Sequence, residues 1–519
     1  MDKDTTPQHL QGLPLFLGTL AVSLATFLIV LDYSIANVSI PYISGDLAVS
    51  VEDGTYVITS FAVGSAIVLP ITGWLTRRLG MIRLIVLSLL MFSALSWLCG
   101  ISRNIVLLVS ARFFQGIAAG PMIPLSQTLI VQMYPPEKKN AAISFWSTVV
   151  VVAPIVGPIL GGWISYDYYW PWIFFINIPV GVFSALVIKF VLYKYETPVE
   201  KVATDWIGLI LLTLTVSCLQ FLLDKGEQYD WLNSDIIRTC AIISFTSFAF
   251  LIPWELFHSS PILELSLLKI RSFSLSVLFI AVMYSIYFGS VVLIPLWLQT
   301  YMGYTSIWAG LSVASMGVMP ALFSSLMGKL TAKFGSPILL FISFILFALS
   351  SFDTAYMNTN ISINQIIFSR FLLGFAILFF IVPDFALQVR DMPNDKLASS
   401  AGLFHFVRAM MGGVGTSVFT TLWIRRSAFH HSNLTSQILD TRPAVNDFYT
   451  LLESLGFMGE KKWVQINELI NTQAAVLGIN DCFFLMGWCF LALIPLLFFA
   501  REKKSKASQI KVTQHAVHG

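Results

Sequence analysis

Long apolar runs separated by short polar loops make up most of the chain. Each run is about 20 residues long, the length that a helix needs to cross a hydrocarbon layer about 30 Å thick. The runs are too long and too continuously apolar for the strands of a barrel, and helices satisfy their own backbone groups in lipid. The pattern therefore predicts an all-α membrane protein with fourteen transmembrane helices, centred near residues 25, 65, 90, 114, 151, 182, 214, 246, 286, 317, 345, 377, 412 and 491.

The first apolar run, from Leu13 to about Ile40, is too long for the apolar core of a signal peptide, and no cleavage site is obvious. We therefore expect it to be the first span. Composition agrees with a membrane protein, because only 11% of the residues are charged, against about a quarter in soluble proteins. The five cysteines lie in or beside apolar runs without the spacing of a metal site, so we expect them to be buried apolar side chains.

Lysine and arginine are concentrated in alternate loops, which predicts how the chain is oriented. The short loops that follow odd-numbered spans carry only Arg103 and Lys225, with Arg238 at the edge of a span. Because positively charged loops stay in the cytoplasm, we expect both termini to be cytoplasmic, and the alternation supports the count of fourteen. The basic segments carry Arg77, Arg78, Arg83, Lys138, Lys139, Lys194, Lys201, Lys269, Arg271, Lys329, Lys333, Arg390 and Lys396, followed by the basic tail 501–519.

One loop on the outer side, residues 425–481, is much longer and more polar than the others. Its apolar residues recur at helical spacing in two groups, which predicts two amphipathic helices on the outer face. Such a loop is either a simple cap or a docking surface for a partner protein. The two groups are Leu451, Leu452 and Leu455, and then Trp463, Ile466, Leu469 and Ile470.

The two ends of the chain share an internal repeat at an offset of about 255 residues. Gly73–Gly80 recurs as Gly328–Gly335, and Arg112–Gly116 recurs as Arg370–Gly374. Units with an even number of spans have the same orientation, so the repeat predicts two parallel six-helix halves that rock about a site between them. Pro41 likewise recurs as Pro295. The predicted divisions are a first half (1–195), two inserted transmembrane helices (196–267), a second half (268–500) that includes the outer loop, and the basic tail (501–519).

Several of these segments resemble motifs of the major facilitator superfamily. Gly73–Gly80 resembles its loop signature, although Arg77 occupies a position that is acidic in the family. Arg112, with Gln115 three residues later, resembles the arginine motif of span four. Ala153–Gly162 resembles the span-five motif of the antiporters in this superfamily.

Other segments resemble the fourteen-span drug:proton antiporters of the EmrB/QacA type in particular. The resemblance covers almost the whole chain and implies the major facilitator fold and a proton-coupled antiporter in the bacterial inner membrane. The segments are Leu31–Pro41, Trp172–Pro179 and, in the outer loop, His430, His431, Gln473, Ala474, Asn480 and Asp481.

The resemblance also implies what such a protein transports and what it works with. The expected activity is export of drugs or other small amphipathic compounds by alternating access, with the proton gradient as energy source and no cofactor. The expected partners are the small-molecule substrate, protons, membrane lipid, and a periplasmic membrane-fusion adaptor with an outer-membrane channel; no nucleic acid is expected. Export of an endogenous metabolite such as a siderophore fits the same sequence nearly as well.

Asp32 and Arg112 are charged residues that the span assignment places deep in the membrane. A carboxylate there costs at least about 3 kcal/mol on insertion scales, so Asp32 marks a functional site, and we expect it to carry the proton. A structural carboxylate bonded to a neighbouring helix is the alternative. Arg112 stays ionised and needs a partner or a water-filled cavity, so we expect it to pair with a nearby acid and to release that acid when the halves move. For its repeat copy, Arg370, a structural role is an equal alternative.

Two motifs are candidates for the conformational change. In span five, small residues four positions apart predict a smooth helix face, and two prolines bend the helix. We interpret this helix as a sliding seam between the halves, with ordinary tight packing as the alternative; its residues are Pro154, Gly157, Pro158, Gly161 and Gly162. In the loop after span two, cations form a candidate inner gate, or simply anchor the loop; the assigned residues are Gly73, Arg77, Arg78 and Gly80.

Four further polar residues in apolar stretches are candidates for the substrate cavity, namely Gln115, Asp384, His405 and Arg408. Asp384 either recognises cationic substrates as a second acid or lies at the cytoplasmic edge near Arg390. His405 and Arg408, on one span, can both face the cavity.

Competing functions find little support in the sequence. A pump driven by ATP would need a phosphate-binding loop and a soluble domain to hold it, and neither motif nor domain occurs. The G-x-S-x-G elbow and the histidine clusters of membrane hydrolases do not occur either. A channel is a weaker alternative, because two parallel halves suit alternating access. We therefore do not expect an enzyme.

Overall fold

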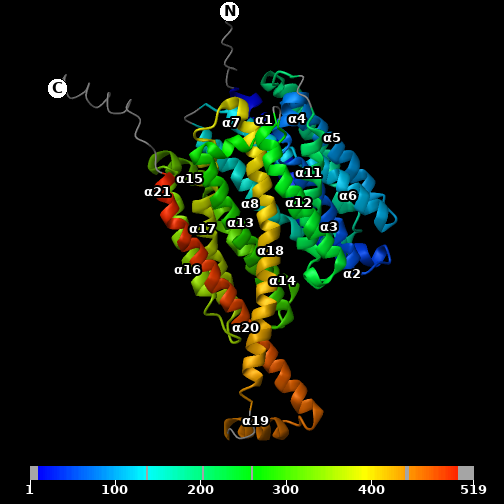
Figure 1. Ribbon diagram of the computed structural model, residues 1–519, viewed down its shortest axis with the longest axis vertical. Helices are drawn as coiled ribbons and strands as arrows, with labels where there is room; N and C mark the ends of the chain where they lie inside the picture. The colour runs from blue at the N-terminus through cyan, green and yellow to red at the C-terminus, as the bar shows by residue number, and fades with distance from the viewer. Residues whose placement is uncertain (1–9, 136–137, 201–203, 259–260, 439–442, 501–519) are drawn as a thin grey trace, which may run out of the picture.

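Figure 1 shows a computed structural model of the chain, which describes residues 10–135, 138–200, 204–258, 261–438 and 443–500. Lys201 and the predicted basic tail 501–519 lie outside the described residues. Throughout the described ranges every regular element is a helix, which confirms the predicted fold class. The helices form one long bundle, and a narrow stalk projects from one end of it (Figure 1).

Eleven helical segments are long and apolar enough to cross a membrane, and two bent pairs raise the number to thirteen. The bends measure 62° between α3 and α4, and 66° in the segment formed by α14 and α15. The bounds are α1 Gly12–Asp46, α3 Tyr56–Val68, α4 Thr72–Leu79, α5 Met81–Gly100, α6 Ile105–Ala119, α7 Met122–Met133, α8 Lys139–Asp167, α9 Trp172–Phe175, α10 Asn177–Val191, α11 Trp206–Lys225, α12 Asp235–Phe257, α13 Arg271–Thr300, α14 Ser306–Ala314, α15 Val318–Phe334, α16 Ser336–Thr354, α17 Ile363–Val389, α20 Glu460–Leu493 and α21 Leu497–Ala500; a single turn, α2 Val51–Gly54, precedes α3.

The predicted span near residue 412 corresponds to α18, Leu397–Thr435, which is 39 residues long. This helix falls outside the thirteen apolar segments, and its buried part includes the polar residues His405 and Arg408. It packs against α13 and α20 within the bundle (Figure 1). The helices are therefore consistent with fourteen spans.

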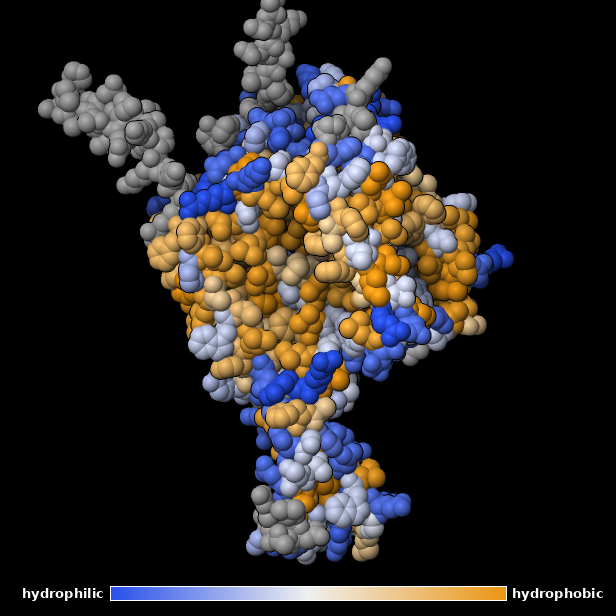
Figure 2. All heavy atoms as spheres, viewed as in Figure 1, coloured by the Kyte–Doolittle hydropathy of each residue, from blue (hydrophilic) through white to orange (hydrophobic). Residues whose placement is uncertain are grey.

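The surface of the bundle agrees with a protein that crosses the membrane many times. Figure 2 shows a broad band of hydrophobic residues across one face of the bundle, with hydrophilic residues gathered above and below it. The start of α1 lies at one end of the bundle together with α4, the helix of Arg77 and Arg78 (Figure 1), and we name this end the basic end. The opposite end carries the stalk and is named the stalk end.

The two halves of the bundle repeat the same local structure. Gly80 ends α4 with φ +86°, and its repeat copy Gly335 ends α15 with φ +79°, a backbone conformation that glycine adopts without strain. The two inserted helices pack on one another, and α11 also contacts α3 of the first half and α18 of the second. The inserted pair therefore lies against both halves.

The close contacts between the halves lie at the basic end. A Cβ atom on Gly402 of α18 would lie 2.6 Å from the carbonyl oxygen of Leu69, and one on Gly73 would lie 2.6 Å from Cα of Ser399. On the other side of the bundle, a Cβ on Gly328 would lie 2.7 Å from the carbonyl oxygen of Asn140. Glycine thus lets helices of opposite halves touch backbone to backbone, and the bundle is closed at this end.

The outer loop forms the stalk, but not as two separate amphipathic helices. Of the first predicted group, Leu451 and Leu452 lie on such a helix, α19 Pro443–Ser454, at the tip of the stalk (Figure 1), and Leu455 lies in the turn after it. The second group, residues 463–470, belongs to the first turns of α20, which continues without a break into the last span. The prediction was wrong here because helical spacing shows a helix without showing whether it continues into the next apolar run.

Candidate functional site

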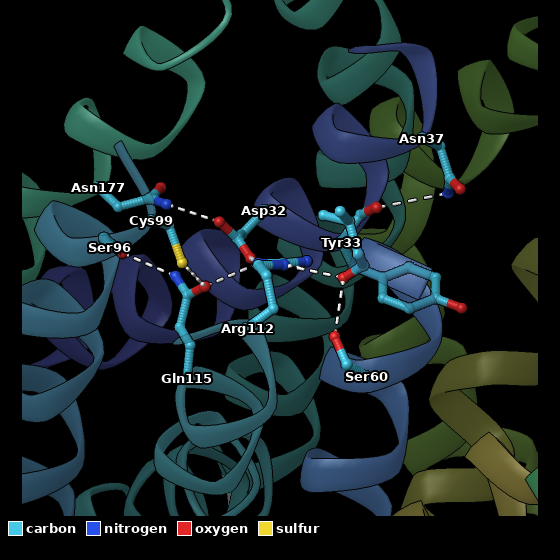
Figure 3. Close-up of polar contacts among 10 residues, drawn as sticks. Asp32, Tyr33, Asn37, Ser60, Ser96, Cys99, Arg112, Gln115 and Asn177 are labelled. Atoms are coloured by element: carbon cyan, nitrogen blue, oxygen red, sulfur yellow. Dashed lines mark hydrogen bonds and ion pairs between the residues drawn. The ribbon is translucent and has the colours of Figure 1, made fainter. Parts of the chain in front are cut away.

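Asp32 and Arg112 meet inside the first half of the bundle. Both side chains are fully buried, and Arg112 Nη1 lies 2.5 Å from Asp32 Oδ2. Asp32 comes from the middle of α1 and Arg112 from α6. In Figure 3 the carboxylate of Asp32 points toward Arg112, whereas the ring of its neighbour Tyr33 points to the opposite side of α1. The structure therefore brings together the two residues predicted to couple protons, although their role stays a prediction.

Two amides complete this cluster, and one of them escaped the sequence analysis. Asn177, the first residue of α10, donates to Asp32 Oδ1 at 2.7 Å. Gln115 accepts from Arg112 at 2.8 Å and donates to Ser96 on α5 at 2.7 Å. Gln115 is fully buried here, so it belongs to the ion-pair cluster. Asn177 lies in the segment Trp172–Pro179. The sequence identified this segment as a motif but did not predict that the amide of Asn177 contacts Asp32.

Close helix packing fixes the position of the arginine. A Cβ on Gly116 would collide with the backbone carbonyl of Phe61, so α6 and α3 approach each other more closely than larger residues allow. Arg112 Nε then donates to the carbonyl oxygen of Val57 at 3.1 Å, and its guanidinium lies 4.2 Å from the ring centroid of Phe61. The arginine is therefore held by α3 on one side and bonds Asp32 of α1 on the other.

In this cluster the negative charge of Asp32 is balanced by the positive charge of Arg112. Asp32 accepts from one cationic and one neutral donor, and these bonds satisfy its charged form. A proton bound to the same carboxylate would compete with the guanidinium for Oδ2. Binding of a proton at Asp32 would therefore break the bond between α1 and α6, and its release would restore it.

The repeat copy in the second half contains the arginine without the acid. Arg370 is buried, donates to Ser290 Oγ at 2.7 Å and also bonds Thr354. Ser290 precedes Arg370 by 80 residues, as Asp32 precedes Arg112, so a hydroxyl occupies the position of the carboxylate. Among the described residues, no ion pair is formed by Arg370. The side chain borders a small cavity, together with Phe483 and Tyr287.

A second set of buried polar residues joins the two halves directly. Gln127 of α7 donates to Gln388 of α17 at 2.9 Å and also bonds His405 of α18, with 2.7 Å between Gln127 Oε1 and His405 Nε2. His405 was a predicted residue of the substrate cavity, whereas neither Gln127 nor Gln388 was predicted to lie at a site. Arg408, one turn further along α18, donates to the hydroxyl of Tyr284 at 3.2 Å.

Asp384 lies in α17 and is fully buried, one turn before Gln388. Its backbone carbonyl accepts from Ser276 of α13 at 3.1 Å. It is buried inside the bundle, five residues before α17 ends at Val389, and Arg390 pairs with Asp391 at 3.3 Å, so its two predicted places stay alternatives. Its place beside the contacts between the halves leaves a role in substrate recognition as a prediction.

The small-residue face of α8 packs on α1, inside the first half, whereas α8 also contacts α15 and α17 of the second half; its role as a sliding seam stays a prediction. A Cβ on Gly157 would lie 2.6 Å from Ser34, and one on Gly161 would lie 2.7 Å from the carbonyl oxygen of Ile35, both on α1. The carbonyl of Pro154 accepts from Ser34 at 3.1 Å. The helix that these residues face carries Asp32, so the motif positions the ion pair. A role of Pro158 and Gly162 in bending or sliding stays a prediction.

The loop after span two contacts other parts of the chain through its two arginines. Arg77 Nη1 lies 2.5 Å from Glu264 Oε1, in the linker after the inserted helices, and Arg78 bonds Thr204. The glycines differ in role, since Gly80 takes the turn with positive φ and Gly73 allows α4 to contact α18. These contacts place the loop where the halves meet, as its assignment to a gate requires.

The sequence profile of the Major Facilitator Superfamily matches residues 22–416. Multidrug export protein EmrB from Escherichia coli (strain K12) is 40% identical over 493 residues, which cover 95% of this chain and 96% of that protein. Fatty acid resistance protein FarB from Neisseria gonorrhoeae is 38% identical over 492 residues, covering 95% and 97%. The crystal structure of the human organic anion transporter MFSD10 shares the fold, with a TM-score of 0.55 and 14% identity over 94% of this chain and 98% of that one.

Two repeated helical halves with an ion pair buried inside one of them are typical of secondary membrane transporters. The chain belongs to the Major Facilitator Superfamily, and within it to the EmrB type.

Proposed function

We propose that the chain is a proton-coupled antiporter that exports drugs or other small amphipathic compounds by alternating access. The observation that carries the proposal is the fully buried pair of Asp32 and Arg112, at 2.5 Å. A buried ion pair is costly to maintain in a membrane, and it is useful where its charge must change during transport. Names of relatives such as multidrug export protein EmrB support the substrate class.

Proton binding at Asp32 would act on the packing of the first half. A proton on the carboxylate weakens its attraction to the guanidinium, so α1 loses one of its bonds to α6. Because Gly157 and Gly161 hold α1 tightly against α8, a movement of α1 would carry α8 with it. Helix α8 in turn contacts α15 and α17 of the second half, so the change would reach the contacts between the halves.

The proposed location is the bacterial inner membrane, with the basic end in the cytoplasm and the stalk in the periplasm. The distribution of lysine and arginine supports this orientation. In the conformation described here the halves touch at the basic end, so the site between them would be closed to the cytoplasm.

Transport in reconstituted vesicles with an imposed pH gradient tests the proton carrier. Asp32→Asn keeps the size of the side chain but removes the titratable group, and its single amide oxygen can accept from only one of the two donors, Arg112 or Asn177. We expect gradient-driven transport to fall to background, while the purified variant stays folded and monodisperse. Full gradient-driven uptake by Asp32→Asn would show that the proton is carried elsewhere. Asp53→Asn is the matched control, because Asp53 lies in α2 and bonds only Ser50 among the described residues.

The substrate class has a second candidate, an endogenous metabolite such as a siderophore. The FarB relative, whose name specifies fatty acid resistance, favours amphipathic substrates in general over one drug class. Competition between a cationic dye and fatty acids in the vesicle assay distinguishes a broad from a narrow substrate range.

The stalk is proposed to dock a periplasmic membrane-fusion adaptor, which would connect the exporter to an outer-membrane channel. Its base is held by Asp481, which pairs with Arg426 at 2.6 Å and with His430 at 2.8 Å. Its tip, α19, exposes apolar side chains that no described residue covers, among them Leu451 at 53% exposure. Such a surface suits a protein partner.

Replacing residues 436–459 with a short glycine-serine linker tests this docking, since α18 ends at Thr435 and α20 begins at Glu460. We expect export from intact cells to be lost while transport in vesicles is retained. Loss of both activities would instead make the tip a structural cap.

A further inference from the structure

The linker that follows the inserted helices places one buried acid between cations of the two halves. Glu264 is 7% exposed at its side chain and precedes the short helix η4, Leu265–Lys269. Its Oε1 lies 2.5 Å from Arg77 of α4, in the first half. Its Oε2 lies 3.5 Å from Lys396, directly before α18 of the second half. One carboxylate therefore contacts both halves at the basic end.

A neutral contact adds to this arrangement on the side of the second half. Ser399, in the first turn of α18, donates to Glu264 Oε1 at 3.2 Å. The same Ser399 is the residue against which Gly73 packs, so the acid lies directly at the backbone contact between α4 and α18. The carboxylate is thus at the point where the halves would separate if this end opened.

The linker itself is fixed to the inserted helices. The backbone N–H of Leu263 donates to Glu255 of α12 at 3.1 Å, and Glu255 is buried. Because α11 contacts α3 and α18, the inserted pair is anchored on both halves. Glu264 is therefore presented by the linker of the inserted pair, which belongs to neither half and contacts both.

The charges explain why an acid is needed here. Arg77 and Lys396 are both cations, so without Glu264 the two halves would present like charges to each other across the closed contact. With Glu264 between them, each cation is attracted to a shared anion. Arg77 occupies a position of the loop signature that is acidic in the family. In this chain the acid at the contact is Glu264, which comes from the linker.

We propose that Glu264 is a positioning residue for transport that locks the basic end shut, and that the inserted helices serve to present it. The lock holds the outward-facing arrangement, and it opens when the separation of α4 from α18 removes Arg77 or Lys396 from the carboxylate. Such a contact can bias a two-state equilibrium because it exists in only one of the two states. This inference rests on the transport function proposed above.

Distances between spin labels test the lock directly. Labels are attached to cysteines at Tyr193 and Phe334, exposed residues of opposite halves at the basic end, in a chain whose five native cysteines are replaced by alanine. Double electron–electron resonance in lipid nanodiscs then reports the distance between the halves. Neither substrate nor a proton gradient is present, so failure of the lock and failure of the proposed proton coupling are distinguishable.

For Glu264→Gln we expect a several-fold larger population at long distance, because the amide keeps the shape of the side chain but loses its charge. Asp391→Asn is the matched control, since Asp391 follows α17 at the same end and, within the described part of the chain, forms an ion pair only with its neighbour Arg390. This control should leave the distance distribution unchanged. An unchanged distribution for Glu264→Gln would overturn the proposal.

A double variant separates the lock from a general loss of structure. Adding Arg77→Gln to Glu264→Gln removes one of the two like charges, so we expect the short distance to return in part. A merely structural role for Glu264 predicts no such rescue, and further opening in the double variant would also contradict the lock. Glu264→Asp, which keeps the charge on a shorter side chain, should give an intermediate population.

Discussion

The two halves of this transporter bury the same arginine in the same packing but surround it with different chemistry. Arg112 lies over Phe174 at 5.4 Å, and Arg370 lies over Phe483 at 5.1 Å. The first arginine bonds a carboxylate, whereas the second bonds the hydroxyl of Ser290. The repeat has therefore preserved the scaffold of the site and kept the titratable group in one half alone.

This difference suggests that the halves divide the work. A hydroxyl neither gains nor loses a proton at ordinary pH, so the bond between Arg370 and α13 does not respond to a proton gradient. The bond between Arg112 and α1 does respond if Asp32 titrates. The first half would then change its helix packing during transport, while the packing of the second half around Arg370 would stay the same.

Removing each arginine should give the largest difference between the halves. Arg112→Met leaves the buried Asp32 without its cation, which costs about 3–5 kcal/mol of stability, and we expect gradient-driven transport to be lost. Arg370→Met leaves the hydroxyl of Ser290 without this donor while Thr354 still bonds Ser350, which costs about 1–3 kcal/mol, and should keep most of the transport. Thermal unfolding and vesicle transport measure both. Equal loss of transport in the two variants would contradict a division of work.

A smaller effect is expected from Asn177, which bonds the acid that the second half lacks. Asn177→Ala removes a hydrogen bond to a charged group, worth about 1.5–3 kcal/mol, so we expect transport about tenfold slower. Ser184→Ala, on the same helix, is a suitable control because its buried hydroxyl has no hydrogen-bond partner among the described residues. If the two variants transported equally well, the amide would not be part of the coupling site.

The two halves should differ least in how much stability they lose when a closely packed glycine is replaced by alanine. Gly116→Ala forces a methyl group onto the carbonyl of Phe61, and Gly374→Ala brings one to 2.5 Å from the carbonyl oxygen of Met316. Each should cost about 1–3 kcal/mol of stability, by a similar amount in both halves. Gly162→Ala should have little effect, because the nearest atom is 3.9 Å from its Cβ position. A large inequality between Gly116→Ala and Gly374→Ala would mean that the repeat is not structural.

Sequence reasoning worked best where one physical rule acts on many residues. Apolar runs of the length of the membrane predicted helices that the structure contains, and α18, with buried His405 and Arg408, is the span whose hydropathy is weakest. Reasoning worked less well for contacts between helices. The small-residue face of α8 predicted a close partner correctly but did not identify that partner as α1, because the face does not encode which helix fills it.

The sequence by itself determined the membrane class, the helical fold, the repeat of the halves and the two charges, Asp32 and Arg112, that lipid makes costly. These features follow from local chemistry, since burial of a charge or of a backbone group in hydrocarbon has the same cost in any fold. Only the tertiary structure decided which side chains share a site. Asn177 reaches Asp32 across 145 residues of chain, and Glu264 reaches Arg77 across 187, distances over which sequence spacing carries no information about contact.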